Sequence, residues 1–304
     1  MRAKVILNPY ANRWRALKRQ PEMESVLQNA NIPYDLTLTT APGEGVRLAY
    51  QAVLAGYSPI LAAGGDGSIS DVVNGIMQAV NESHRKPPPL GIIPLGSAND
   101  LAVNLKIPVD LNLAGVAISQ NHIKWIDLGI VNNRFFDNNS AMGLEPSITL
   151  IQQQISYPRG VLRYLLATLI GVMKKPAWQV DLEWENGCYQ GPVSLVTVGN
   201  CAVTGGLFYM TPHADPYDGL LTFVYGYLPT RRQILQILPR TMKSGQGSYV
   251  EHPSIHEIHS PWLKIHAHHP TPLHADGEIQ STATNQIDYQ ISPHCLPVLI
   301  PDVS

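Results

Sequence analysis

Two segments of the chain share one plan: an apolar strand, a turn containing glycine, and then a helical pattern. The first, Leu61–Asn74, contains the run Gly-Gly-Asp-Gly, and the second, Leu90–Ala102, contains Pro-Leu-Gly-Ser. Glycine lets a backbone approach a bulky ligand without a Cβ clash, and the start of the following helix favours a phosphate. Parallel strands joined by helices would place both turns at one sheet edge, where α/β folds bind ligands.

Serine and aspartate in these segments predict helix starts and a metal. Ser68–Asp71 and Ser97–Asp100 have the spacing of a capping box. Asp66 places a carboxylate beside the phosphate site, which is reasonable if Mg²⁺ lies between the two anions. The first turn is no Walker P-loop, because no Gly-Lys-Ser/Thr follows, and Ser70 occupies the third glycine position of a dinucleotide fingerprint. Either turn alone could be purely structural, but the two together favour a nucleotide site.

The fold expected from the whole chain is an α/β domain followed by a β domain. A length of 304 residues favours two domains. Residues 1–127 alternate between strand and helix patterns and predict a parallel sheet, to which residues 293–304 return. Residues 128–292 predict an antiparallel β-sandwich with hairpin turns at Asn132-Asn133 and Asn186-Gly187.

The composition is that of a globular protein and limits the partners. Hydrophobic residues make up 44% and charged residues 14%, with a formal net charge of −2. This charge gives no reason to expect nucleic-acid binding. Three dispersed cysteines favour a reducing compartment. Every apolar run is shorter than the ~20 residues of a spanning helix, so we expect a cytoplasmic protein.

These motifs resemble a known family. The run Gly64–Ser68 followed by Pro94–Asp100 is similar to the diacylglycerol kinase catalytic domain, a family of bacterial lipid kinases related to the sphingosine kinases. The similarity continues at Asn8-Pro9, Asp127-Leu128-Gly129, Asp215, Asp218-Gly219-Leu220 and Asp276-Gly277-Glu278.

The resemblance implies an ATP- and Mg²⁺-dependent lipid kinase that transfers the γ-phosphoryl group to a lipid hydroxyl. Diacylglycerol, giving phosphatidic acid, is the first choice of acceptor. Phosphatidylglycerol, a monoacylglycerol, ceramide and a sphingoid base are the alternatives. ATP would lie between the two domains, and the enzyme would associate peripherally with the inner face of the membrane. A homodimer is left open.

The resemblance also assigns residues. The nucleotide would contact Asn8, Pro9, Asn12, Thr40, Gly64, Gly65, Asp66, Gly67, Ser68, Asp71, Gly96, Ser97 and Asn99. The catalytic Mg²⁺ would be held through its waters by Asp66, Asp100 and Asp127. A second, structural Mg²⁺ would be held by Asp215, Asp218 and the carbonyl of Leu220. Serine stands where the family more often has threonine at positions 68 and 97, which keeps the hydroxyl.

The general base would come from the segment Asp276-Gly277-Glu278. A carboxylate that accepts the proton of the reacting hydroxyl is typically worth ~10²–10⁴ in rate. In a strand, Asp276 and Glu278 would point the same way, with Gly277 leaving room between them. The residues alone do not decide which carboxylate takes the proton. We favour Glu278, with Asp276 orienting it or a water molecule.

Two other functions compete with this interpretation. The first is an NAD kinase-like enzyme, whose site also uses a Gly-Gly-Asp-Gly turn, but the Pro94–Asp100 and Asp276–Glu278 segments count against it. The second is a non-catalytic nucleotide- or lipid-binding regulator. The presence of all the acidic residues that the mechanism needs counts against that alternative.

Three further signals have alternative explanations. The basic run Asn12–Arg19 is either a solvated helix face or a contact for anionic lipid head groups. His266 and His268 would share a strand face, and we interpret them as exposed strand residues rather than metal ligands. Val161–Met173, the one helix expected in the second domain, would pack in the core or line a groove for a lipid tail.

Overall fold

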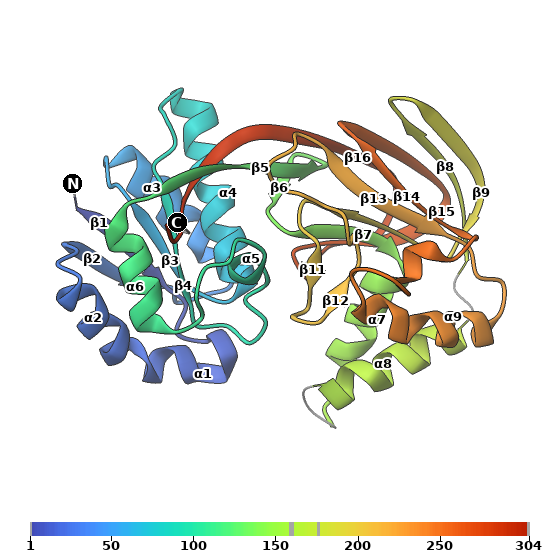
Figure 1. Ribbon diagram of the computed structural model, residues 1–304, viewed down its shortest axis with the longest axis horizontal. Coiled ribbons are helices and arrows are strands. Elements are labelled where there is room, and N and C mark those ends of the chain that lie inside the picture. The colour runs from blue at the N-terminus through green and yellow to red at the C-terminus, as the bar shows by residue number, and fades with distance from the viewer. Residues whose placement is uncertain (1, 158–160, 175–176, 303–304) are drawn as a thin grey trace. The chain divides into compact units, whose positions relative to one another are not determined.

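The computed structural model describes residues 2–157, 161–174 and 177–302. The chain forms two compact units (Figure 1). The first unit consists of Met1–Leu128, Arg134–Asp137 and Ser292–Ser304. The second unit consists of Gly129–Asn133 and Asn138–Ile291.

The first unit contains a parallel sheet, as the sequence predicts. Its strands lie in the order β4-β3-β1-β2. They are β1 (Ala3–Leu7), β2 (Tyr34–Leu38), β3 (Ile60–Gly64) and β4 (Leu90–Pro94). The end of the last strand, β16 (Glu278–Leu299), extends this sheet, because Val298 pairs with Leu90 in parallel.

Helices cover the sheet of the first unit, and the strand residues alternate between two buried faces. Val5 and Leu7 join a core cluster with residues of α2 and α6, whereas Ile6 between them is buried on the opposite face. Strands buried on both faces are typical of parallel sheets. The helices of this unit are α1 (Ala11–Lys18), α2 (Gln20–Asn29), α3 (Glu44–Leu54), α4 (Asp66–Ser83), α5 (Asp100–Asn104) and α6 (Leu111–Gln120).

A short excursion of the chain returns to the first unit at β6 (Arg134–Phe136). It pairs with β5 (Ile123–Val131) through a turn in which Asn132 and Asn133 have φ angles of 45° and 71°. Positive φ at both central residues is the type I′ hairpin geometry, so this predicted turn is confirmed.

Asn74 on α4 attaches that excursion to the first unit. Its Nδ2 donates to the Phe135 carbonyl at 2.9 Å, and its Oδ1 accepts from the Phe135 N–H at 3.1 Å. One side chain therefore satisfies both backbone groups of Phe135.

The second unit contains antiparallel strands in the order β14-β13-β10-β7-β15-β16. Their bounds are β7 (Asn139–Gly143), β10 (Leu195–Gly199), β13 (Leu221–Gly226), β14 (Ile255–Ser260) and β15 (Trp262–Ala275). A separate hairpin of β8 (Trp178–Trp184) and β9 (Gly187–Val193) also pairs with β15. Gly187 belongs to the ladder opposite Trp184, so Glu185 and Asn186 form the loop of this hairpin, one residue earlier than predicted.

Strand β15 passes from one layer of the second unit to the other. Residues Leu263–Ala267 pair with β8, whereas Leu273–Ala275 pair with β7, and the register shifts between them. Aromatic rings pack between the layers: Trp184 of β8 lies 5.5 Å from Phe223 of β13, measured between ring centroids. The predicted β-sandwich is confirmed.

The second unit has more helical structure than predicted. The expected helix, α8 (Val161–Met173), is present, but the prediction of a single helix is wrong. Two more lie within the described residues, α7 (Leu144–Gln154) and α9 (Arg231–Ile237). The smaller elements are β11 (Val203–Thr204), β12 (Phe208–Tyr209) and the 3₁₀ turns η1 (Leu238–Met242) and η2 (Tyr249–Glu251). No helix in the described part of the chain is long and apolar enough to cross a membrane.

We expect Asn74→Ala to lower the free energy of unfolding by about 1–3 kcal/mol, because it leaves the N–H and C=O of Phe135 without their partner. Gln78→Ala, at an exposed position on the same helix, should change it by less than about 0.5 kcal/mol. Denaturant unfolding measures both values. Equal effects of the two substitutions would contradict this role of Asn74.

Candidate active site

The two glycine turns meet at one edge of the parallel sheet. β3 and β4 pair up to Gly64 and Pro94, and the turns follow directly. A Cβ added to Gly96 would lie 2.5 Å from the Cα of Gly65, and one added to Gly65 would lie 3.1 Å from the Cα of Gly96. The predicted juxtaposition of the turns is confirmed. A Cβ would clash with the facing backbone at position 96 and would make a tight contact with it at position 65.

Asp66 lies where these turns meet, as the first residue of α4. Its Oδ2 accepts from the Asn99 N–H at 3.0 Å, while its Oδ1 is buried and has no hydrogen-bond partner. Burial raises the pKa of Asp66, and nearby backbone N–H groups of Asp100, Leu101 and Asn99 partly oppose this. A buried carboxylate oxygen without a partner is a position suited to a ligand or a cation's water shell.

Ser68 does not cap α4, so the first predicted capping box is wrong. The helix begins at Asp66, directly after the glycine turn, with Gly65 at the N-cap. Ser68 therefore lies within the first turn, where its Oγ accepts from Asn8 Nδ2 at 2.9 Å. A Cβ at Gly64 would lie 2.5 Å from that Oγ, so the small residue is needed here too.

The second predicted capping box is also wrong. α5 begins at Asp100, and Asn99 is its N-cap in a left-handed conformation with φ 56°. Asn99 Oδ1 accepts from the Gly96 N–H at 2.8 Å and thereby closes the turn. Asparagine tolerates this conformation and bonds its own backbone locally, which displaces serine from the cap. Ser97 lies exposed in the turn.

The segment after β1 reaches the same edge. Asn8 Oδ1 accepts from the Tyr10 N–H at 3.0 Å. Asn12 Nδ2 donates to the Gly96 carbonyl at 3.5 Å. Together with the Asn8–Ser68 bond, these contacts bring four predicted nucleotide residues into one group: Asn8, Asn12, Ser68 and Gly96.

The basic run that begins at Asn12 is not a uniform helix. Asn12, Arg13 and Trp14 have left-handed φ angles of 48°, 57° and 69° inside α1. This conformation costs roughly 1–2 kcal/mol per residue for side chains larger than glycine. Such strain is concentrated at functional sites, which agrees with the position of this segment beside the glycine turns.

The remaining predicted nucleotide residues are Thr40, Asp71, Pro9 and Gly67. Thr40 donates through its N–H and its hydroxyl to Glu44 Oε2, at 2.6 and 2.8 Å, and these bonds lower the pKa of Glu44 to about 2. Asp71 packs against Gly45 of α3. Pro9 is buried, and Gly67 lies in the first turn of α4.

The other two predicted metal carboxylates are buried. Asp100 is 5% exposed at the start of α5, and Asp127 on β5 is fully buried. Asp127 Oδ1 accepts from the His294 N–H at 2.6 Å. Among residues that the structure describes, no group of three or more His, Cys, Asp or Glu side chains could hold a metal directly. Mg²⁺ commonly keeps several waters and uses one or two carboxylates, and the unpaired Asp66 Oδ1 fits that mode.

The predicted strand arrangement of Asp276 and Glu278 is wrong. β15 ends at Ala275 and β16 begins at Glu278, so Asp276 and Gly277 form a two-residue loop with φ angles of 47° and 76°. Asp-Gly is a preferred sequence for this type I′ turn. The two carboxylates therefore do not share a strand face: Asp276 is buried and Glu278 is exposed.

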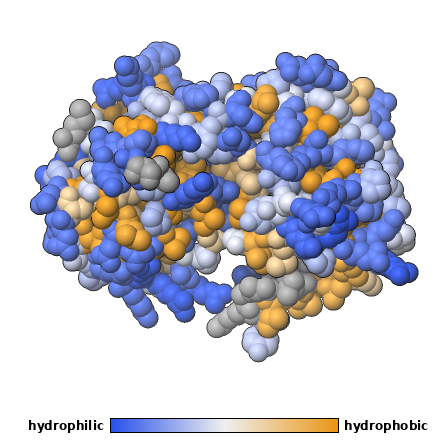
Figure 2. Space-filling view, in the orientation of Figure 1, coloured by the Kyte–Doolittle hydropathy of each residue, from blue (hydrophilic) through white to orange (hydrophobic). Residues whose placement is uncertain are grey.

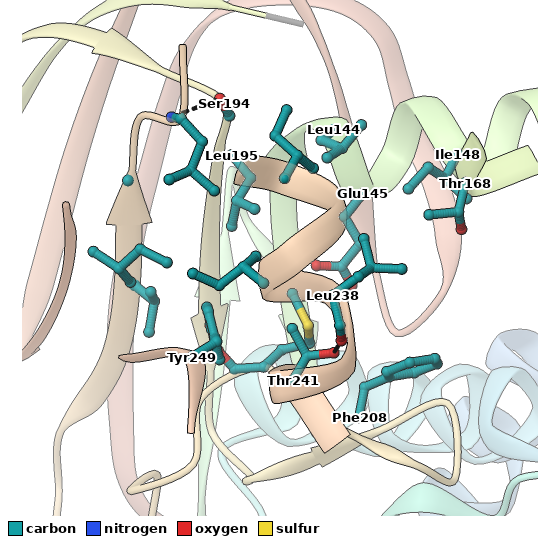
Figure 3. Close-up of a pocket in the computed structure, with 17 residues that line it drawn as sticks. Leu144, Glu145, Ile148, Thr168, Ser194, Leu195, Phe208, Leu238, Thr241 and Tyr249 are labelled. Carbon is teal, nitrogen blue, oxygen red and sulfur yellow. Dashed lines mark hydrogen bonds between the residues drawn. The ribbon is translucent and has the colours of Figure 1, made fainter. Parts of the chain in front are cut away.

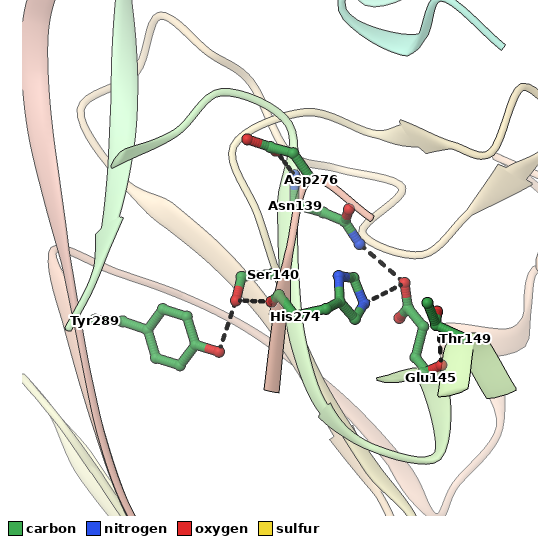
Figure 4. Close-up of polar contacts among 7 residues, drawn as sticks. All are labelled: Asn139, Ser140, Glu145, Thr149, His274, Asp276 and Tyr289. Carbon is green, nitrogen blue, oxygen red and sulfur yellow. Dashed lines mark hydrogen bonds and ion pairs between the residues drawn. The ribbon is translucent and has the colours of Figure 1, made fainter. Parts of the chain in front are cut away.

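Asp276 is tied to the start of β7 (Figure 4). Its Oδ1 accepts from the N–H groups of Asn138 and Asn139 at 3.0 and 3.3 Å, and its own N–H donates to the Asn139 carbonyl at 2.7 Å. This carboxylate therefore orients the turn that carries Glu278.

An ion pair near this turn, between buried His274 and partly buried Glu145, was missed in the sequence. His274 Nε2 lies 3.1 Å from Glu145 Oε1, and Asn139 Nδ2 donates to the same oxygen at 3.0 Å (Figure 4). Burial alone would raise the pKa of Glu145, but the charge of His274 and the polar side chains around it lower the pKa. In the sequence Glu145 is an acidic residue two positions after Gly143. Its position relative to other residues gives no sign that it pairs with His274.

Comparison with known proteins identifies the family. Residues 2–131 match the family model described as the diacylglycerol kinase catalytic domain, and residues 139–300 match the YegS C-terminal NAD kinase beta sandwich-like domain. A protein of Chromohalobacter salexigens named as a YegS-like lipid kinase is 32% identical over 253 residues, covering 79% of this chain and 76% of its own. The chain belongs to the diacylglycerol kinase catalytic-domain family.

Further relatives agree with this assignment. A protein of Staphylococcus saprophyticus named diacylglycerol kinase is 26% identical over 278 residues, covering 91% of this chain and 88% of its own. A crystal structure from Bacillus anthracis with a diacylglycerol kinase name has a TM-score of 0.79 at 20% identity, covers 99% and 97% of the two chains, and shows the shared fold. The predicted family and the prediction of a lipid kinase are confirmed.

The second unit of this diacylglycerol kinase family member contains an apolar cavity (Figure 3). Its space is about 760 Å³, part of it open to solvent. Helices α7, α8 and α9 contribute Ile148, Thr168 and Ile234, and β10 contributes Leu195. Because Thr168 of α8 lines the cavity, the structure supports the alternative in which this helix lines a groove.

The loop before β13 contains the predicted structural metal residues. Asp215 Oδ1 accepts from the Tyr217 N–H at 3.1 Å, and Asp218 Oδ1 accepts from the Leu220 N–H at 2.9 Å. Both carboxylates are exposed. The structure brings these residues into one short loop shaped by two side-chain-to-backbone turns.

The histidines on β15 are exposed strand residues, as interpreted from the sequence. His266 and His268 are exposed on one face, and His268 Nε2 lies 3.1 Å from Asp181 Oδ2.

We expect Gly96→Ala to push the two turns apart and to lower the free energy of unfolding by about 1–3 kcal/mol, because the new Cβ would meet the Gly65 backbone, which cannot move aside as a side chain does. Gly245→Ala, where a Cβ meets nothing within 4 Å, is the matched control and should stay within about 0.5 kcal/mol. Denaturant unfolding gives both values. A neutral Gly96→Ala would show that the turns do not depend on this contact.

Proposed function

We propose that this chain transfers the γ-phosphoryl group of ATP to a hydroxyl group of a membrane lipid, with Mg²⁺ as the metal. The observation that carries the proposal is Asp66, whose buried Oδ1 has no hydrogen-bond partner at the junction of two glycine turns. Relatives named as diacylglycerol and lipid kinases support the acceptor class, and diacylglycerol is the first acceptor to test.

The nucleotide phosphates would lie over the start of α4. Gly65 and Gly96 present backbone without side chains there, and the helix N-terminus favours negative charge. The exposed hydroxyl of Ser97 and the amide of Asn12 are polar groups at the same edge. Binding would thus depend on backbone shape more than on cationic side chains.

Asp66, Asp100 and Asp127 would hold Mg²⁺ through water molecules. When bound, Mg²⁺ would neutralise the charge on the phosphates during transfer. Asp66 is the best placed of the three, because one of its oxygens is unpaired and the other is fixed by Asn99. Asp215, Asp218 and the Leu220 carbonyl would hold a second, structural Mg²⁺, since all three offer the oxygen ligands that this ion prefers.

Glu278 would act as the general base. The oxygen of the lipid hydroxyl forms a bond to the γ-phosphorus, the bond from that phosphorus to the ADP oxygen breaks, and the hydroxyl proton passes to the Glu278 carboxylate. Glu278 is exposed at the start of β16, where an acceptor could reach it. Asp276 would act as a positioning residue, since its carboxylate is held by two backbone N–H groups.

The cavity of the second unit supports a lipid acceptor rather than a soluble nucleotide. Its lining is mainly apolar, which suits a hydrocarbon chain. An acyl chain would remove its methylene groups from water there, at ~0.8 kcal/mol each. NAD, the acceptor in the competing interpretation, has no such chain.

An exposed apolar stripe on α8 supports contact with a membrane. Leu162, Leu166, Leu169 and Met173 follow helical spacing and are exposed, Leu162 by 64%. Figure 2 shows hydrophobic surface over this helix. Lys174, Arg231 and Arg232 are exposed at its end, where Arg231 Nε donates to the Met173 carbonyl. Apolar residues beside cations suit the surface of a bilayer that contains anionic lipid.

The test is transfer of labelled γ-phosphate from ATP and Mg²⁺ to diacylglycerol and other lipids in mixed micelles. We expect Glu278→Gln to lower kcat by ~10²–10⁴, because the base is lost. Asp66→Asn should lower it by about 10² or more, since a metal contributes several kcal/mol. Asp288→Asn, at an exposed carboxylate on β16, should keep full activity.

The same variants separate the roles. Mg²⁺ with ATP should raise the melting temperature of the wild type and of Glu278→Gln, but not of Asp66→Asn, because Asp66, unlike Glu278, acts on the metal. Label on NAD and on no lipid would favour the NAD kinase-like alternative. Binding of ATP with no turnover on any acceptor would favour the regulator.

We expect the double substitution Leu166→Ser and Leu169→Ser to weaken binding to vesicles of phosphatidylcholine and phosphatidylglycerol by tenfold or more, since each buried leucine contributes ~1.5–3 kcal/mol. Leu113→Ser, at an exposed leucine of α6 in the first unit, is the control and should bind as the wild type does. Co-sedimentation with vesicles measures both. Equal binding of the double variant and the wild type would show that the exposed apolar stripe of α8 does not contact the membrane.

A further inference from the structure

The basic run Asn12–Arg19 has no role in the proposed reaction beyond its first residue. It contains four cations and no carboxylate. Asn12 reaches the Gly96 carbonyl, but no cation of the run contributes to the candidate site described above. A solvated helix face usually carries both signs of charge in alternation, so a run of one sign needs an explanation.

Three cations of the run, Arg13, Arg15 and Lys18, are exposed and form no ion pair with any residue that the structure describes. The fourth is Arg19, whose Nε lies 2.8 Å from Glu22 Oε2. Several other exposed arginines do have partners: Arg2 pairs with Asp35, Arg47 pairs with Glu44, and Arg231 donates to the Met173 carbonyl. The positive charge of the run is therefore available to a partner outside the chain.

Two exposed aromatic rings lie beside these cations. Tyr10 is 43% exposed and Trp14 is 52% exposed, and their ring centroids are 4.3 Å apart in an edge-to-face arrangement. The Tyr10 hydroxyl donates to the Thr40 carbonyl at 3.4 Å, and its N–H donates to Asn8 Oδ1 at 3.0 Å. The aromatic pair is thus held in place at the surface, where much of its apolar area remains in water.

Most of helix α1 faces solvent. Its buried residue is Ala16, whereas Arg15, Leu17 and Lys18 around it are exposed. Figure 1 shows α1 on the outside of the first unit. Arg15 and Lys18 are three positions apart and share one side of the helix. Cations and apolar side chains are therefore presented together on one short segment.

A bilayer surface that contains anionic lipid matches this combination. Tryptophan and tyrosine rings favour the level of the lipid head groups. Lysine and arginine are attracted to anionic head groups, and arginine also matches the geometry of a phosphate. A soluble polyanion would pair with the cations but would leave Leu17 in water, although this side chain is 38% exposed.

We propose that Tyr10 and the segment Arg13–Lys18 form a docking surface for a bilayer that contains anionic phospholipid. This inference rests on the proposed function, which requires the enzyme to reach an acceptor in a membrane. It assigns a membrane contact to the first unit as well as to the second.

The test is co-sedimentation with vesicles of phosphatidylcholine that contain phosphatidylserine, without nucleotide or acceptor lipid. We expect the double variant Arg15→Gln and Lys18→Gln to bind about 10- to 30-fold more weakly than the wild type, because each cation near an anionic surface contributes about fivefold in affinity. The control Lys86→Gln and Lys106→Gln removes the same charge from exposed positions of the first unit and should change binding by less than about twofold. On vesicles of phosphatidylcholine alone, the two double variants should bind equally.

Trp14 gives an independent measurement. It is one of five tryptophans in the chain, and bromine on the lipid acyl chains quenches tryptophan fluorescence at close range. With brominated vesicles of the same head-group composition, the quenched fraction of the emission should be larger for the wild type than for Trp14→Phe. Equal quenched fractions would show that Trp14 stays out of the bilayer and would contradict the docking surface.

Two further outcomes would overturn the inference, with melting curves to check that each variant is folded. Wild-type binding by the Arg15 and Lys18 double variant would make the run a solvated helix face. Equal weakening in both double variants would show that net charge alone matters.

Arg13→Gln separates the docking surface from the nucleotide. Loss of the stabilisation by Mg²⁺ and ATP in this variant, with vesicle binding unchanged, would assign the run to the nucleotide and overturn the inference. If the wild type phosphorylates no lipid, the proposed function fails, but vesicle binding still decides the docking surface because it is measured without turnover.

Discussion

The contact between the backbones of Gly65 and Gly96 is the constraint on which the candidate site in the first unit of this kinase depends. Two parallel strands end at neighbouring positions, and their turns approach so closely that a Cβ at position 96 would clash with the backbone of Gly65. The approach puts the Asn99 N–H within reach of Asp66, which fixes one carboxylate oxygen and leaves the other buried. The position of the acidic group therefore follows from backbone packing, and no cationic side chain is needed to hold it.

In the second unit a hairpin turn, rather than the start of a helix, positions the acidic residues. The Asp276-Gly277 turn is closed by positive φ angles, and the carboxylate of Asp276 binds the backbone at the start of β7. Asn139 then joins this turn to Glu145. In both units a candidate site carboxylate, Asp66 or Glu278, lies beside a neighbour whose own hydrogen bonds are to the backbone. Such support would keep a site ordered before its ligands arrive.

The sequence predicted most of the architecture but not the details of its turns. Strand and helix periodicity located β3, β4 and α8 because those patterns are strong and local. Both capping boxes were wrong, because glycine and Asn99 started the helices in place of serine. A strand was expected at Asp276, but Asp276 and Gly277 form a turn. The sequence does contain the signal for it, because Asp-Gly favours the positive φ angles of a hairpin turn. Glu145 could not be found, since its partners Asn139, Thr197 and His274 are brought together only by sheet pairing.

The places where the fold carries an energetic cost coincide with the places where chemistry is expected. Three consecutive left-handed residues, Asn12, Arg13 and Trp14, follow Asn8, and Asp66 keeps a buried oxygen without a hydrogen-bond partner. Each feature is unfavourable for folding alone, by roughly 1–3 kcal/mol. A lone cost could be a packing accident, but both of these adjoin the glycine turns of the first unit. Ligands that supply the missing partners would recover this energy on binding, so the same groups that weaken the free protein give the complex its specificity.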